Sequence, residues 1–167
     1  MGRIARFLKD GVCYYIQSRS NQNRKIFKAD PDYERYIRLL KKYKLRYQIN
    51  IYGYCLLPAE AHLIVHPSDS GNLPLFMQGV NQSYAIYYNI CYRRVGKVWG
   101  QRFQSNLIYS DHDLIRHIKM IEFLPVQVNR ACSPTEHPWS SCTFRIMGSD
   151  SIIDPAPPVG PIVPVGN

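Results

Sequence analysis

Two side chains that can bind a metal ion, Glu60 and His62, lie two residues apart in an apolar stretch of the chain. Alternate side chains of a β-strand point to the same face, so a strand would place both on one side. A carboxylate oxygen and an imidazole nitrogen could then share one divalent cation, and the carboxylate favours a hard ion, Mg²⁺ or Mn²⁺. Two ligands also fit a second interpretation, in which His62 lies on an edge strand and Glu60 is solvated.

The chain carries a large excess of positive charge. Lysine and arginine number 21 against 12 acidic residues, so the formal net charge of the 167 residues is +9. This excess favours a polyanionic partner, most commonly nucleic acid, because Lys and Arg neutralise phosphates and release their counterions. Charge alone also fits a basic surface that is merely solvated.

Positive charge and an aromatic ring occur together around Trp99. The basic and amide side chains there could bind phosphates, and the indole ring could stack on an unpaired base. Trp99 could equally be an anchor of the core. A second basic group lies near the N-terminus, at Arg3, Arg6, Arg19, Arg24 and Lys25. The residues that we expect to contact DNA are Arg19, Arg24, Arg93, Arg94, Lys97, Trp99, Gln101 and Arg102.

Hydrophobic periodicity predicts the elements that position these residues. Strands are expected at 12–18, 49–57, 61–66 and 103–109, and helices from Asp32, over 72–92, and from Asp111 or Asp113 to the break at Pro125. The order strand, helix, strand, strand, helix, strand, helix predicts an α+β fold. We expect a ferredoxin-like antiparallel sheet with helices packed on one face.

Length and the 46% hydrophobic fraction fit one domain and exclude a disordered chain. We place the domain at residues 1–148 and expect the Pro-rich tail, 149–167, to be extended or disordered unless it docks on something. The sequence lacks 18 consecutive apolar residues and a secretory segment, so we expect a cytoplasmic protein without a membrane partner. Five scattered cysteines argue against a zinc site or disulfides.

The stretch Tyr-Cys-Leu-Leu-Pro-Ala-Glu-Ala-His-Leu-Ile-Val at 54–65 resembles a signature of the REP-associated tyrosine transposases. These belong to the single-tyrosine HUH (His-hydrophobic-His), IS200-like transposase superfamily. The resemblance rests on several elements in the family's order and spacing. They occupy residues 1–6, 19–21, 54–65, 77–84, 96–103, 120–126 and 138–141.

The resemblance implies a reaction in which a tyrosine attacks a DNA phosphodiester, with a divalent metal on two histidines polarising the phosphate. This sequence departs from that pattern at the chemical positions. The first histidine falls on Glu60, the second on His62, the tyrosine on Met120 and a metal-binding asparagine on Leu124. A thioether cannot form a stable phosphoester, so no catalytic residue is secure. With Mg²⁺ or Mn²⁺ at Glu60 and His62, other ligands would be water unless Glu122 or His117 turned inward.

Three functions follow from this reading. The first is a DNA-binding protein for DNA hairpins or single strands whose strand cleavage is lost. The second is an active transposase or nuclease that uses Glu60, His62 and another tyrosine, such as Tyr109 or those of the second helix. The third is a protein-interaction adaptor acting through the Pro-rich tail. Neither the DNA sequence recognised nor the oligomeric state can be predicted.

Overall fold

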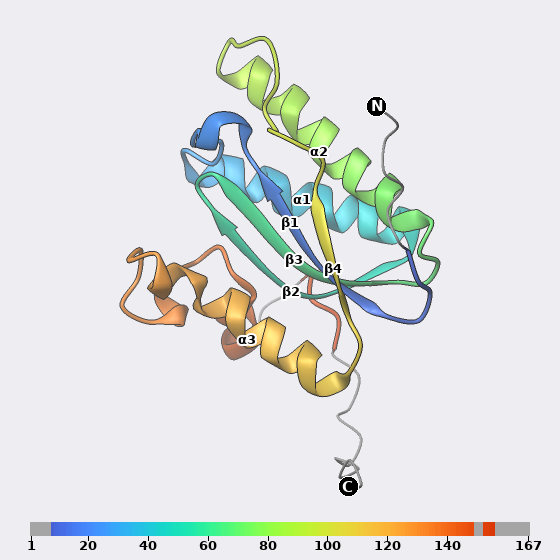
Figure 1. The fold of residues 1–167 in the computed structure, drawn as a ribbon. Coiled ribbons are helices and arrows are strands. Elements are labelled where there is room, and N and C mark those ends of the chain that lie inside the picture. Colours follow the sequence, from blue (N-terminus) through green and yellow to red (C-terminus); the bar gives the residue numbers. More distant parts are fainter. Residues whose placement is uncertain (1–7, 149–151, 156–167) are drawn as a thin grey trace, which may run out of the picture.

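The computed structural model describes residues 8–148 and 152–155. Its centre is a four-stranded sheet in the order β2-β3-β1-β4, and every neighbouring pair is antiparallel (Figure 1). This order is the ferredoxin-like arrangement. The strands are β1 (Cys13–Arg19), β2 (Ile49–Leu57), β3 (Glu60–Pro67) and β4 (Gln104–Ile108).

The helices cover both faces of this sheet (Figure 1). One face packs against α1 (Asp30–Tyr47) and α2 (Asn72–Cys91), and the other against α3 (Asp111–Gln127). The α+β class and the antiparallel sheet are confirmed, whereas the expectation of helices on one face holds for α1 and α2 only. The physical reason is that the sheet has a second apolar face, where residues such as Cys55 and Ile64 need cover. The remaining elements of the described residues are a short helix, α4 (Ser141–Met147), and the 3₁₀ turns η1 (Asn21–Asn23) and η2 (Pro134–Glu136).

A β-bulge explains how β2 serves both faces. The pairing with β3 shifts between Ile51 and Gly53, so the alternation of side chains changes phase there. Ile51 faces α1 and α2, and after the bulge Tyr54 does so, while Cys55 faces α3. The side chains of β2 therefore do not alternate strictly between the two faces from residue 49 to 57.

The layer of α1 and α2 is held by close packing and by tyrosines. Gly79 of α2 lies against the ring of Tyr43 in α1, where an added Cβ would approach ring atoms to 2.6 Å. Tyr84 and Tyr88 of α2 are fully buried. Their hydroxyls donate to the backbone carbonyls of Ile26 and Lys25.

Helix α3 begins at Asp111 and ends two residues past the expected break at Pro125. Its N-cap is Ser110, whose side chain accepts a hydrogen bond from the Asp113 backbone N–H. Pro125 lies inside the helix, which continues to Gln127. Pro125 removes one backbone donor from the helix, and it lies so close to the end of α3 that only two helical residues follow it.

The chain returns to the domain at residues 152–155. Ile152 is buried in the core under α1 and α2. The Asp154 backbone N–H donates to the Ile51 carbonyl at 2.7 Å, and Lys44 donates to the Asp154 carboxylate at 2.6 Å. The packed unit therefore extends past the predicted boundary at 148; the other tail residues lie outside the described part of the chain. Within residues 8–148 and 152–155, all helices are too short or too polar to cross a membrane.

Candidate functional site

Glu60 and His62 lie at the start of β3, on the face that α3 covers. Strand β3 is central, between β2 and β1, and His62 is only 2% exposed. The interpretation of His62 as an edge-strand residue is therefore wrong. Because the two residues are two apart in a strand, both point to the same face, as expected.

Four side chains form a continuous chain of polar contacts here. His62 Nε2 lies 2.9 Å from Glu60 Oε2, and His62 Nδ1 lies 2.8 Å from the Tyr15 hydroxyl. Arg19 Nε lies 3.1 Å from the other carboxylate oxygen, Glu60 Oε1. Since an ionised carboxylate only accepts, His62 Nε2–H donates to Glu60; in the neutral imidazole Nδ1 then accepts from the Tyr15 O–H.

The surroundings shift two pKa values in opposite directions. The hydrogen bond from His62 is the largest influence that lowers the pKa of Glu60, and the Arg19 charge acts in the same sense. Burial, with a smaller effect of the Glu60 charge, raises the pKa of Tyr15 to about 12. At neutral pH the network therefore holds an ionised Glu60 and a protonated Tyr15.

This donor set does not fit a divalent ion as it stands. Both nitrogens of His62 and both oxygens of Glu60 already have hydrogen-bonding partners. Arg19 already supplies a positive charge beside the carboxylate. Among residues 8–148 and 152–155 there is no group of three or more His, Cys, Asp and Glu side chains suited to a metal.

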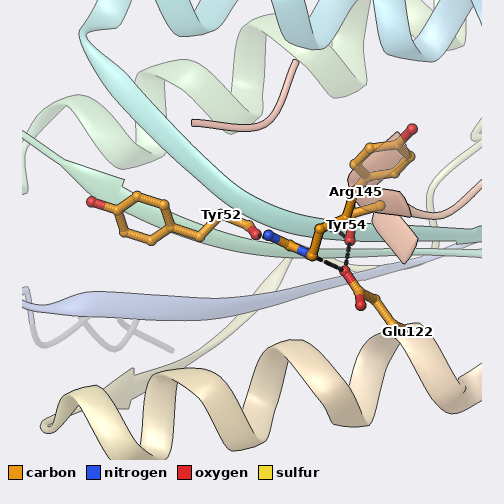
Figure 2. Close-up of polar contacts among 5 residues, drawn as sticks. Tyr52, Tyr54, Glu122 and Arg145 are labelled. Carbon is orange, nitrogen blue, oxygen red and sulfur yellow. Dashed lines mark hydrogen bonds and ion pairs between the residues drawn. The ribbon is translucent and has the colours of Figure 1, made fainter. Parts of the chain in front are cut away.

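The two additional ligands considered from the sequence are used elsewhere. Glu122 on α3 accepts hydrogen bonds from Ser141 and from Arg145 Nε and Nη2, the latter at 3.1 Å. Figure 2 shows Arg145 beside Glu122, with its other contact at the Tyr52 carbonyl. His117 donates from Nδ1 to the Asp113 carbonyl at 2.7 Å, and its ring contacts Tyr15.

Met120 and Leu124 occupy one side of α3. Met120 is 37% exposed and lies one turn after His117. Leu124 is half-buried and packs against the core between α3 and the sheet. Neither side chain offers an ionisable proton or an oxygen lone pair.

A polar recess of about 440 Å³ lies where β1 ends and brings three predicted residues together, Arg19, Gln101 and Arg102. The loop before β4 pairs with the end of β1: Asn21 N–H donates to the Val98 carbonyl and Gly100 N–H to that of Arg19. A Cβ on Gly100 would lie 3.1 Å from the Ser20 carbonyl oxygen, so glycine permits this approach. The recess is lined by Gln17, Arg19, Ser20, Asn21, Gln22, Gly100, Gln101, Arg102 and Gln104.

A second recess, of about 690 Å³, adjoins the first along α2 and is also lined by Gln101 and Arg102, together with Lys97 and Trp99. Trp99 is half-buried and packs on the core. Its Nε1–H donates to the Asn81 carbonyl at 2.9 Å. The ring therefore anchors this loop while also lining the recess.

The other predicted contact residues lie apart from the two recesses. Arg93 is exposed after α2 with a positive φ of 48°, and Arg94 lies over the ring of Tyr88. Arg24 follows η1 and is half-buried. Arg3 and Arg6 are outside the described residues.

The tyrosines considered as alternative nucleophiles are not near Glu60. Tyr84 and Tyr88 belong to α2, which packs on the opposite face of the sheet. Tyr109 follows β4, whose Ile108 pairs with Cys13, whereas Glu60 pairs with Arg19 at the other end of β1. Six residues of strand separate the two ends, about 20 Å.

Sequence reasoning missed Tyr15 and Gln17. Gln17 is placed so that its amide oxygen can accept from Arg19 Nε and Nη2 at 3.0 Å. One signal was available: Tyr15 and Gln17 share one face of the predicted first strand, 12–18, and Arg19 continues the same spacing directly after it. The sequence alone does not show that β1 pairs with β3 in the register that places Gln17 opposite His62.

Comparison with known proteins identifies the class. The profile of the family described as "Transposase IS200 like" matches residues 11–115, a range that holds the whole sheet and both Glu60 and His62 but ends before Met120. The chain belongs to the IS200-like transposase family, as its resemblance implied.

One solved structure shows the same fold. A REP-associated tyrosine transposase bound to a REP hairpin is similar with a TM-score of 0.73 and 17% sequence identity, over 94% of this chain and 93% of that chain. A protein from Deinococcus radiodurans, assigned provisionally to the transposases, gives a TM-score of 0.49 and 13% identity, over 73% of this chain and 95% of that chain. No curated protein sequence matches the chain.

Proposed function

We propose that this protein binds DNA hairpins or single-stranded DNA, as a member of the REP-associated branch of its family. The observation that carries the proposal is the recess at the end of β1, where Arg19 and Arg102 lie among five amide side chains. Guanidinium groups suit phosphate oxygens, and amides can bond to base edges. The similar fold of a relative bound to a REP hairpin supports the same ligand class. The compartment that we propose is the cytoplasm.

Under the proposed function, the chain does not cleave DNA covalently at the position of the family's tyrosine. Met120 cannot supply the attacking oxygen, and Leu124 is not a metal ligand. Glu60 and His62 bond to Arg19 and Tyr15. The chain thus keeps the surface for DNA while its chemistry is lost.

One observation favours a second candidate, a nuclease with a different nucleophile. The order Tyr15 hydroxyl, His62 imidazole and Glu60 carboxylate is that of a nucleophile, a base and a group that orients the base. In that case a tyrosyl oxygen would bond to phosphorus, the 3′ oxygen would leave, and His62 would take the hydroxyl proton. A covalent adduct mapped to Tyr15 would establish this candidate.

The test is binding of a labelled single-stranded DNA that folds into a hairpin with unpaired ends. Fluorescence polarisation would measure its affinity for the wild type, for Lys97→Gln with Arg102→Gln, and for Arg38→Gln with Lys41→Gln on α1 as a charge-matched control. We expect the first double variant to lose roughly tenfold or more in affinity and the control to lose much less, because only the first lines the recesses. Equal losses, or no binding by the wild type at low salt, would contradict the proposal and leave the adaptor function to be tested.

A further inference from the structure

The position at which the family's metal is expected already holds a cation in this chain. Arg19 Nε lies 3.1 Å from Glu60 Oε1, and the side chains of Arg19 and Glu60 are 63% and 24% exposed. Glu60 Oε2 is bonded to His62 Nε2, which is fixed on its other side by Tyr15. To bind here, a divalent ion would have to displace Arg19 from the Glu60 carboxylate. It would also have to displace either the proton or the Tyr15 hydroxyl from the His62 imidazole.

Three groups hold the arginine in one orientation. Glu60 bonds to Nε, and the Gln17 amide oxygen can accept from Nε and Nη2 at 3.0 Å. The Arg19 backbone carbonyl accepts from Gly100 N–H at 3.0 Å, which ties the residue to the loop that carries Arg102. The oriented guanidinium lines the polar recess together with Arg102.

We propose that the Arg19 guanidinium takes the place of the divalent cation at Glu60 and His62 and binds a DNA phosphate in the recess, so that DNA binding needs no metal. Glu60 is then a positioning residue for Arg19, and His62 and Tyr15 hold Glu60. A planar guanidinium can bind a phosphate through two parallel N–H groups, which a compact ammonium cannot. The inference rests on the proposed DNA binding for its phosphate, but not for the displacement of the metal.

The first arm of the test uses the metal alone. Thermal unfolding of the wild type is followed in EDTA and in about 5 mM Mn²⁺, since an ion bound to the folded state raises the melting temperature. We expect no shift in the wild type. A rise in the melting temperature that Glu60→Gln abolishes would overturn the proposal, because it would show that the ion displaces Arg19.

The second arm uses the labelled DNA hairpin with wild type, Arg19→Ala and Arg19→Lys. We expect the wild type to bind with the same affinity in EDTA and in Mn²⁺. Arg19→Ala should lose about tenfold in affinity and have a salt slope lower by about 0.7. Arg19→Lys should recover only part of the affinity. Arg38→Ala is the matched control. Loss of affinity in EDTA, full recovery with Arg19→Lys, or unchanged binding by Arg19→Ala would each overturn the proposal. If no variant and no wild type bound DNA, the proposed function would fail, whereas the Mn²⁺ arm would still decide what occupies Glu60.

Discussion

The sequence resemblance places Met120 at the family's tyrosine position, where a thioether sulfur cannot supply the attacking oxygen. We predict that the wild type forms no covalent adduct with hairpin DNA in Mg²⁺ or Mn²⁺. Met120→Tyr alone should also form none, because Leu124 is no ligand and Arg19 occupies Glu60. Denaturing gels of labelled DNA, with mass spectrometry of any adduct, make the measurement. An adduct formed by Met120→Tyr but not by the wild type would show that the remaining groups suffice for cleavage.

His137 is a buried histidine that makes stability depend on pH. Its Nε2–H donates to the Leu56 carbonyl at 2.8 Å, and burial lowers its pKa below the ordinary 6.5. At a pH between the lowered pKa of the folded chain and the ordinary pKa of the unfolded chain, His137 binds a proton only in the unfolded chain. The free energy of unfolding therefore falls as the pH falls. His137→Gln keeps a donor for Leu56 without the titration.

We therefore predict a steeper loss of unfolding free energy on acidification in the wild type than in His137→Gln. The difference between the proteins cannot exceed about 1.4 kcal/mol per pH unit for one proton. Urea unfolding at about pH 7.5 and about pH 5.5 measures it. Parallel losses in the two proteins would contradict the prediction.

Single residues were predicted well where their chemistry is local and poorly where it depends on pairing. The same-face placement of Glu60 and His62 follows from strand geometry and is confirmed. The bond between Tyr15 and His62 joins residues 47 positions apart, and a shift of one residue between β1 and β3 would remove it.

At the scale of elements, Glu122 joins α3 to α4 and to β2. It accepts from Ser141 and Arg145, Ser141 accepts from the Tyr54 backbone N–H, and Arg145 donates to the Tyr52 carbonyl (Figure 2). Glu122 is 8% exposed. Because Ser141 and Arg145 both donate to it, its removal leaves them without their shared acceptor. The contact therefore ties α3 to α4 and to the middle of β2.

We predict that Glu122→Ala lowers the free energy of unfolding by about 1–3 kcal/mol, the usual cost of losing a hydrogen bond to a charged group. Lys119→Ala, at an exposed position of the same helix, should change it by less than about 0.5 kcal/mol. Chemical denaturation of both variants and of a double variant with Arg145→Ala measures the cost and the coupling. Similar costs for Glu122→Ala and Lys119→Ala would show that this contact is dispensable.

Elements were easier to predict than their placement. The range 49–57 agrees with the structure, and the two long helices were found, because apolar spacing is a local property. The face that each helix covers was not predicted. The bulge between Ile51 and Gly53 exchanges the faces of β2, and this turns Cys55 toward α3. Nothing in the apolar pattern of 49–57 separates a bulge from regular alternation.

Across the whole molecule, four of the arginines that we expect to contact DNA lie in two groups. One group lines the recesses, with Arg19 and Arg102. The other follows α2, where Arg93 is exposed and Arg94 lies over Tyr88. The net charge of +9 predicted a polyanionic partner but could not show this division, which depends on how the loop before β4 pairs with β1.

We predict that Arg93→Ala with Arg94→Ala weakens binding of the DNA hairpin and lowers the slope of log affinity against log salt by about 1.4, if both contact single-stranded phosphates. The effect on affinity should add to that of Lys97→Gln with Arg102→Gln, if the two pairs bind different phosphates. Polarisation titrations over a range of salt measure slope and affinity for each double variant and for the quadruple variant, with thermal melts to confirm folding. Unchanged affinity and slope in Arg93→Ala with Arg94→Ala would confine the DNA surface to the recesses beside Glu60. A quadruple variant no weaker than either double variant would instead show that both groups act on one shared phosphate contact.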